Sequence, residues 1–133
     1  MGERSTTSAE LTWLGDLRFD AASGTHHLVI DSNSERGASP MQTLAISLAA
    51  CMAIDLVDIL AKGRYELRSL RAEFSGLRAA EPPKRFEEIA LHFTLDTDAP
   101  AHAVERAIAL SREKYCSVWN SMRQDIAFNV TWS

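Results

Sequence analysis

Apolar residues alternate with polar residues in five stretches of the chain, and in two longer stretches they recur with helical spacing. The alternation predicts strands over residues 11–20, 25–31, 66–79, 86–96 and 126–132. A long helix is expected over residues 39–62, a second opens at Asp98-Ala99-Pro100, and a short third runs from about Cys116 to Gln124. The order β-β-α-β-β-α-β predicts an α+β domain with one antiparallel sheet or two.

Turn residues separate these elements. Ala21–Gly24 joins the first two strands into a hairpin, although Gly15-Asp16 interrupts the first of them. The dipeptide Pro82-Pro83 marks the tip of a second hairpin. We expect residues 1–9, which are polar, to be frayed, and the whole chain 1–133 to form a single domain.

The long helix has a clear start and end. Ser39 and Gln42 make a capping box around Pro40, and Gly63 supplies the stop. No charged residue occurs between Met41 and Ala53. A helix that is apolar on every face must be covered on every face. The helix should therefore cross the centre of the domain or pack against a partner subunit.

Composition limits the class of protein. Apolar residues make up 46% and charged residues 24%, as in a globular protein. The net charge of -4 argues against a nucleic-acid partner, which requires a basic face. The longest apolar stretch, residues 44–54, is shorter than the roughly 20 residues of a membrane span. With neither a span nor a signal peptide at residues 1–10, we expect a cytoplasmic protein.

The two cysteines are the candidate chemistry. In a reducing compartment they are more often reactive or simply buried than a structural disulfide. Cys51 lies in the middle of the apolar helix, where an inert packed thiol is the simpler interpretation. Cys116 precedes the short helix, whose free N–H groups should favour a thiolate, although a packed thiol remains an alternative. The spacing of cysteines and histidines does not indicate a metal site or a known hydrolase.

The runs SPMQTLAISLAACMAIDLVDIL and VERAIALSREKYCSVWNSM resemble the OsmC/Ohr family of osmotically induced and organic hydroperoxide resistance proteins, in its general OsmC-like branch. The resemblance covers nearly the whole chain. It implies an intertwined homodimer around two long helices. It also implies a peroxidase in which Cys51 attacks the peroxide and Cys116 resolves the product as a disulfide. An arginine assists the thiolate, and Arg18 is the first candidate, with Arg36 as the alternative.

The sequence departs from the family at the acidic partner of that arginine. The family places a carboxylate at or next to position 41, where this chain has Met41 and Gln42. Asp55 or Glu35 is expected to hold the arginine instead. An apolar pocket for an organic hydroperoxide is expected from Met41, Leu44, Met52 and Trp119.

The resemblance also implies recycling by an external thiol or lipoyl-type dithiol, with no bound cofactor or metal. A redox-responsive or small-molecule-binding protein with little turnover is the alternative, and the missing carboxylate favours it. A third possibility is a structural domain whose thiols never meet.

Overall fold

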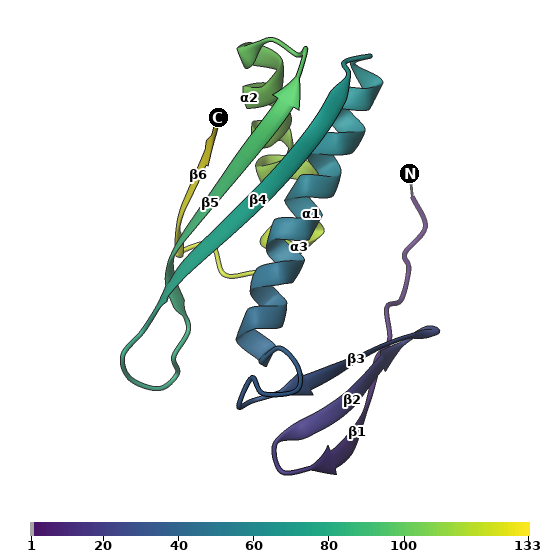
Figure 1. Cartoon of the computed structure of the whole chain (residues 1–133), viewed down its shortest axis with the longest axis vertical. Helices are drawn as coiled ribbons and strands as arrows, with labels where there is room; N and C mark the ends of the chain where they lie inside the picture. Colours follow the sequence, from purple (N-terminus) through teal and green to yellow (C-terminus); the bar gives the residue numbers. More distant parts are fainter. Residues whose placement is uncertain (1) are drawn as a thin grey trace. The chain divides into compact units, whose positions relative to one another are not determined.

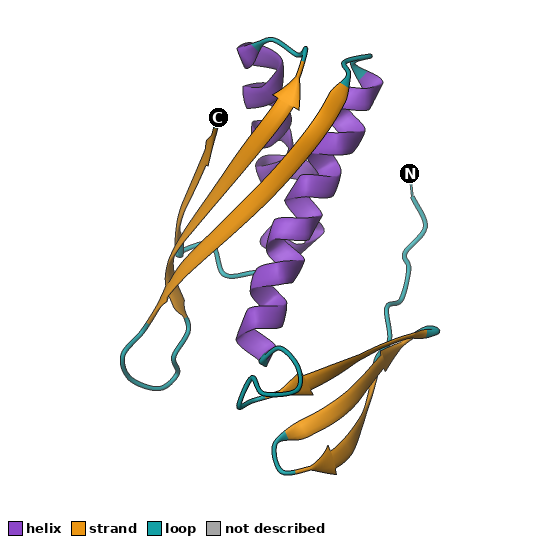
Figure 2. Ribbon diagram, in the orientation of Figure 1, coloured by secondary structure: helices purple, strands orange, loops and turns teal. Residues whose placement is uncertain are grey.

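A computed structural model describes residues 2–133. The chain divides into two compact units, of which the first ends at Leu44 and the second runs from Ala45 to Ser133. Each unit contains one three-stranded sheet, and a long helix begins in the first unit and continues through the second (Figure 2). The expected α+β class is confirmed. The expectation of a single domain stays a prediction.

The first unit is an antiparallel meander of β1 (Glu10–Gly15), β2 (Arg18–Ser23) and β3 (His26–Asp31). The sequence had predicted two strands here, with one continuous strand over residues 11–20. That prediction was wrong because the backbone reverses at Gly15 and Asp16, whose φ angles are 106° and 48°. Glycine adopts positive φ without strain, and aspartate tolerates it better than most residues. The expected Ala21–Gly24 turn is shorter, since β2 continues to Ser23.

One face of this sheet is apolar. The strand register aligns two rows of side chains across it, and residues aligned in this way share a face. The rows are Leu11–Ala21–Leu28 and Trp13–Phe19–Ile30. Trp13 is 66% exposed and Leu11 is 57% exposed, so this apolar face is incompletely covered within the chain.

The second unit is built on a mixed sheet in the order β4-β5-β6. The strands β4 (Leu67–Arg78) and β5 (Phe86–Thr97) form the expected hairpin, and β6 (Ala127–Trp132) runs parallel to β5. Ile89, Leu91 and Phe93 alternate along β5 and are buried, as their spacing predicted. All the helices of this unit lie on that one face of the sheet (Figure 1).

These helices are α1 (Pro40–Lys62), α2 (Ala101–Leu110) and α3 (Ser117–Asn120), with a π-helical turn η1 (Ser111–Tyr115) between the last two. The capping box of α1 is confirmed. The Ser39 N–H donates to Gln42 Oε1 at 2.9 Å, and the Gln42 N–H donates to Ser39 Oγ at 3.2 Å. The third helix begins where expected but ends at Asn120 instead of about Gln124.

The faces of α1 differ in burial. One stripe of four side chains is at most 1% exposed and belongs to the core: Leu48, Met52, Leu56 and Leu60. A second apolar stripe is open to solvent, with Ile46 at 62%, Ile54 at 66% and Val57 at 48% exposed. Because these residues recur at helical spacing, they form one continuous surface, which we call the open face of α1. The chain alone does not cover α1 on every side.

α1 also has the length and hydropathy of a membrane-spanning helix, with a mean hydropathy of 2.1 over 18 residues. Among residues 2–133 no other helix meets both criteria. A long core helix has the same two properties, and the buried leucine and methionine stripe of α1 is characteristic of a core helix.

Candidate functional site

The thiols of Cys51 and Cys116 lie close enough for Cys51 to raise the pKa of Cys116, and neither is in a disulfide. Cys51 is half-buried in the middle of α1, whereas Cys116 is fully buried. Both belong to the second unit. The two thiols are thus neighbours within the second unit, and their reaction with each other stays a prediction.

The turn η1 positions Cys116. The Cys116 N–H donates to the Ser111 carbonyl at 2.7 Å, a bond that spans five residues and defines a π turn. Cys116 is then the N-cap of α3, and its Sγ accepts the Trp119 N–H at 3.3 Å. The Asn120 side chain donates to the Cys116 carbonyl at 2.9 Å. These bonds fix both the backbone and the sulfur of Cys116.

Burial raises the pKa of the Cys116 thiol to about 11. The Trp119 N–H acts in the opposite direction, while the Cys51 thiol and the Asp55 carboxylate raise the pKa further. The sequence had predicted that the helix N–H groups would favour a thiolate here. The N–H contact exists, but the prediction was wrong in its result because burial outweighs that contact. Cys116 keeps its proton at neutral pH.

Asp55 lies on α1 one turn beyond Cys51, and its carboxylate is held inside the second unit. The Ser111 hydroxyl, which is fully buried, donates to Asp55 Oδ2 at 2.7 Å. Asp55 had been expected to hold an arginine, and its hydrogen-bond partner within the second unit is Ser111. Sequence reasoning missed Ser111, because a serine near the end of a helix carries no distinctive signal.

Aromatic rings pack beside Cys116. The rings of Trp119 and Phe128 lie 4.4 Å apart between centroids, and the Arg112 guanidinium lies 4.8 Å from the Phe128 centroid and 5.8 Å from that of Trp119. Trp119 is only 3% exposed. The short α3 is thus anchored to β6, and this holds Cys116 in place.

The two candidate arginines belong to the first unit. The Arg18 guanidinium donates to Asp16 Oδ2 at 3.1 Å and is 22% exposed. Arg18 also pairs across the strands with Asp31, and its charge helps to lower the pKa of that carboxyl. Asp16 provides the ion pair of Arg18 within the first unit, and the expectation that Asp55 or Glu35 holds the arginine stays a prediction.

Asp31 is a buried carboxylate that the sequence analysis did not identify. It accepts the Asn33 N–H at 2.9 Å and the Arg36 N–H at 3.0 Å. These backbone bonds, with the Asn33 bond strongest, hold the pKa of Asp31 below its usual value in spite of burial. Arg36 is exposed, and its N–H closes the loop around Asp31. Asp31 thus shapes the loop that leads into α1.

Gln42, which stands where the family has a carboxylate, is occupied in capping. Its Oε1 accepts hydrogen bonds from the Ser39 N–H and, at 2.9 Å, from the Ser34 hydroxyl. The Gln42 side chain therefore stabilises the N-terminus of α1.

The four residues expected to line a pocket differ in burial. Met52 and Trp119 are part of the core of the second unit, whereas Met41 and Leu44 are half-buried in the first. Their role in binding a substrate stays a prediction.

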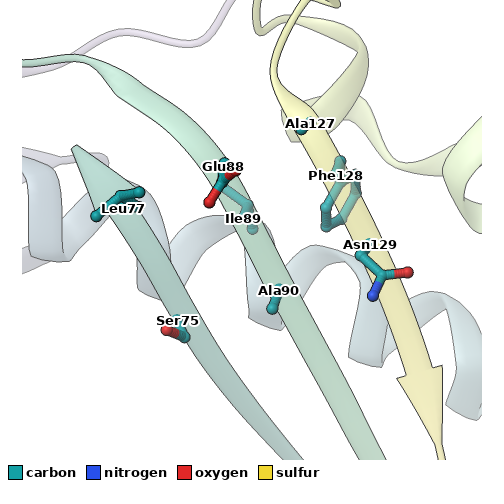
Figure 3. Close-up of a pocket in the computed structure, with 8 residues that line it drawn as sticks. All are labelled: Ser75, Leu77, Glu88, Ile89, Ala90, Ala127, Phe128 and Asn129. Carbon is teal, nitrogen blue, oxygen red and sulfur yellow. The ribbon is translucent and has the colours of Figure 1, made fainter. Parts of the chain in front are cut away.

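An open groove lies elsewhere, across the three strands of the second sheet (Figure 3). None of the four expected pocket residues and neither cysteine lines it. The lining residues are Ser75, Leu77, Glu88, Ile89, Ala90, Ala127, Phe128 and Asn129. In the described part of the chain, histidine, cysteine and acidic residues do not gather into a group that would hold a metal ion.

The comparisons with known proteins agree with this architecture. A family model described as OsmC-like protein matches residues 32–131. Protein YhfA of Escherichia coli strain K12 is 38% identical over 129 residues, which cover 94% of each chain. The crystal structure of a hypothetical protein from Aquifex aeolicus is 27% identical with a TM-score of 0.91, and the match covers 98% of this chain and 96% of that one.

A more distant structure shares the fold. It is named an organic hydroperoxide resistance protein, from Legionella pneumophila, and is 19% identical with a TM-score of 0.73 over 99% of both chains. The family model spans most of the chain, and the relative from Escherichia coli covers nearly all of it. This protein belongs to the OsmC-like family.

Proposed function

We propose that this protein is a thiol-dependent peroxidase that reduces organic hydroperoxides, with Cys51 as the attacking and Cys116 as the resolving cysteine. The observation that carries the proposal is the contact between the two free thiols. Membership of the OsmC-like family supports it, since a protein named for organic hydroperoxide resistance has the same fold.

The two roles follow the family resemblance, with Cys51 on the long helix as the attacking and Cys116 as the resolving cysteine. The pKa of the Cys116 thiol is raised, so Cys116 holds its proton at neutral pH until the resolving step. The Cys51 thiolate attacks the O–O bond and becomes a sulfenic acid, and the alkoxide takes up a proton and leaves as an alcohol. Cys116 then attacks the Cys51 sulfur. The S–O bond breaks, the disulfide forms, and the hydroxyl leaves with the thiol proton as water.

An arginine stabilises the Cys51 thiolate in this proposal. Arg18 is the first candidate because Asp16 and Asp31 hold it on β2, and Arg36 is the alternative. Gln42 takes no part in holding it, since its amide caps α1.

An apolar pocket made by Met41, Leu44, Met52 and Trp119 would favour alkyl hydroperoxides over hydrogen peroxide. The reaction needs no bound cofactor. An external thiol or lipoyl-type dithiol reduces the disulfide, and the protein works in the cytoplasm.

The peroxidase is a homodimer in this proposal. The open face of α1 supports this assembly, because Ile46, Ile54 and Val57 form an apolar surface on the second unit that the chain leaves uncovered. The apolar face of the first sheet, with Trp13 and Leu11 exposed, provides a second such surface.

A redox-responsive protein with little turnover is the second candidate. The raised pKa of Cys116 favours it, because a thiol that resists ionisation resolves a sulfenic acid slowly. The absence of a carboxylate at Met41 and Gln42 points in the same direction.

Mass spectrometry after a stoichiometric dose of cumene hydroperoxide tests the proposal. A peroxidase loses two hydrogens and yields a peptide that crosslinks Cys51 to Cys116. A sulfenic acid that persists on Cys51 supports the redox-responsive alternative. A chain that stays unmodified contradicts both.

Two matched variants separate the roles of the cysteines. Cys51→Ser should abolish peroxide consumption, because the nucleophile is lost. Cys116→Ser should consume about one equivalent and stop at the sulfenic acid. Equal multiple-turnover activity in both variants and the unaltered protein would contradict the mechanism.

A further inference from the structure

We propose that Asp55, held in place by Ser111, is a positioning residue that adds to burial in holding the proton on Cys116 after Cys51 has been oxidised and so slows closure of the disulfide at neutral pH. This inference rests on the proposed peroxidase function and adds to it a control over the second step. Asp55 would set how long the sulfenic acid on Cys51 survives.

The geometry ties the carboxylate to the resolving cysteine through one buried serine. The Ser111 hydroxyl donates to Asp55 Oδ2 at 2.7 Å, and the Ser111 carbonyl accepts the Cys116 N–H at 2.7 Å. Asp55 and Cys51 are one turn apart on α1, so both side chains project from the same region of the helix. Ser111 thereby links the segment that carries Cys116 to the helix that carries Cys51 and Asp55.

Few charged groups act on the Cys116 sulfur. Cys51 and Asp55 on α1 are the ionisable groups that favour its protonated form, and the Trp119 N–H opposes them. On η1 the Arg112 guanidinium stacks on aromatic rings. The side chains of Glu113 and Lys114 on the same turn are exposed to solvent.

Oxidation of Cys51 changes this balance. A sulfenic acid is neutral at the start of the resolving step, so the negative charge that Cys51 contributed is lost. The Asp55 carboxylate remains, and Ser111 fixes it in position. Because the resolving attack requires a thiolate, a carboxylate that favours the thiol reduces the rate of attack. The closing step itself forms the S–S bond and breaks the S–O bond, and the hydroxide that leaves takes up a proton, which balances the one that Cys116 gave up before the attack, and departs as water.

A titration of Cys116 tests the electrostatic part without any peroxide. In a Cys51→Ser background, Cys116 is the one remaining thiol, and the ultraviolet absorbance of its thiolate follows its titration once the signal of a Cys51→Ser/Cys116→Ser reference, which contains both tyrosines, is subtracted. Adding Asp55→Asn should move the midpoint to lower pH. Adding Asp58→Asn is the matched control, since it removes the same charge from an exposed residue on the same helix that pairs with Lys62. Equal midpoints for the two double variants would overturn the proposal.

Single-turnover kinetics test the effect on the reaction. After cumene hydroperoxide is added, Asp55→Asn should close the disulfide faster than the unaltered protein at neutral pH, by roughly three- to fourfold for each unit that the midpoint falls, because the thiolate fraction rises while the nucleophilicity of the thiolate falls with its pKa. The rise of the closure rate with pH should shift to lower pH by the same amount. An unchanged closure rate and pH profile would overturn the inference even if Cys51 reacts normally.

Failure of the peroxidase proposal gives a different result. If Cys51 does not react with the hydroperoxide in the unaltered protein, the kinetic claim falls with the proposed function, and the titration still decides whether Asp55 controls the Cys116 proton.

If Asp55→Asn does not fold, Ser111→Ala replaces it, because this variant keeps the Asp55 charge but removes the hydrogen bond that holds the carboxylate in place. Its midpoint should shift in the same direction by a smaller amount, and an unshifted midpoint would overturn the proposal.

Discussion

The buried thiol of Cys116 predicts a loss of stability at alkaline pH. The pKa of this thiol is about 11 in the folded protein, against an ordinary value of 9.0. The folded state therefore binds the proton more tightly than the unfolded state does. Below about pH 9 both states are protonated and the stabilisation is fully present. It is lost progressively as the pH rises from 9 towards 11, because only the unfolded chain then releases the proton.

The size of the effect follows from the shift. A difference of about two pKa units, at about 1.4 kcal/mol per unit, gives roughly 3 kcal/mol for a thiol that is fully buried. Urea unfolding under reducing conditions, at several pH values, measures the free energy of unfolding. The difference between the unaltered protein and Cys116→Ser should shrink by up to this amount between about pH 8 and pH 11.

Serine does not titrate in this range, so the variant serves as the reference for all other groups that ionise at high pH. A difference that stays constant across the range would refute the reasoning. It would mean that Cys116 titrates alike in the folded and unfolded states, and that burial does not hold the proton.

Three further predictions concern packing and assembly. Ser39→Ala should lower the free energy of unfolding by about 1 kcal/mol, because the N-cap bond to Gln42 is lost; no change in urea unfolding would contradict the cap. Phe93→Ala should cost about 3–5 kcal/mol in the same assay, since Phe93 is fully buried, and a cost below about 1 kcal/mol would contradict its place in the core. Ile54→Asp should convert a dimer to monomers in light scattering, whereas Leu77→Asp, at an equally exposed site on β4, should not.

The sequence predicted those parts of the fold that depend on local chemistry. The cap of α1 follows from Ser39, Pro40 and Gln42, and the alternation along β5 identified its buried residues. The N-terminal strand was misjudged because a turn at Gly15 and Asp16 depends on two positive φ angles. A single Gly-Asp pair inside an apolar stretch indicates a break but does not distinguish a bulge from a reversal.

The candidate site was predictable only in part. The two cysteines were found from their residue type and the family resemblance, but their surroundings were not. The bond from Ser111 to Asp55 joins residues 56 positions apart, and no local pattern indicates such a contact. The π turn before Cys116 adds one residue to a helical turn, and sequence periodicity does not resolve an insertion of that size. The ion pair of Arg18 with Asp16 was not predicted, and the role of Arg18 at the thiolate stays a prediction.

The difference between the two sulfurs comes from opposing physical effects at Cys116. Its place at the N-cap of α3 gives it one N–H donor, and from this alone a thiolate would be expected. The same position is fully buried, and one hydrogen bond does not replace the water that a thiolate loses there. Cys51, which is half-buried on a long helix, keeps part of its surface in contact with solvent. The structure therefore distinguishes the two sulfurs by burial, and the order in which they react is part of the proposed mechanism.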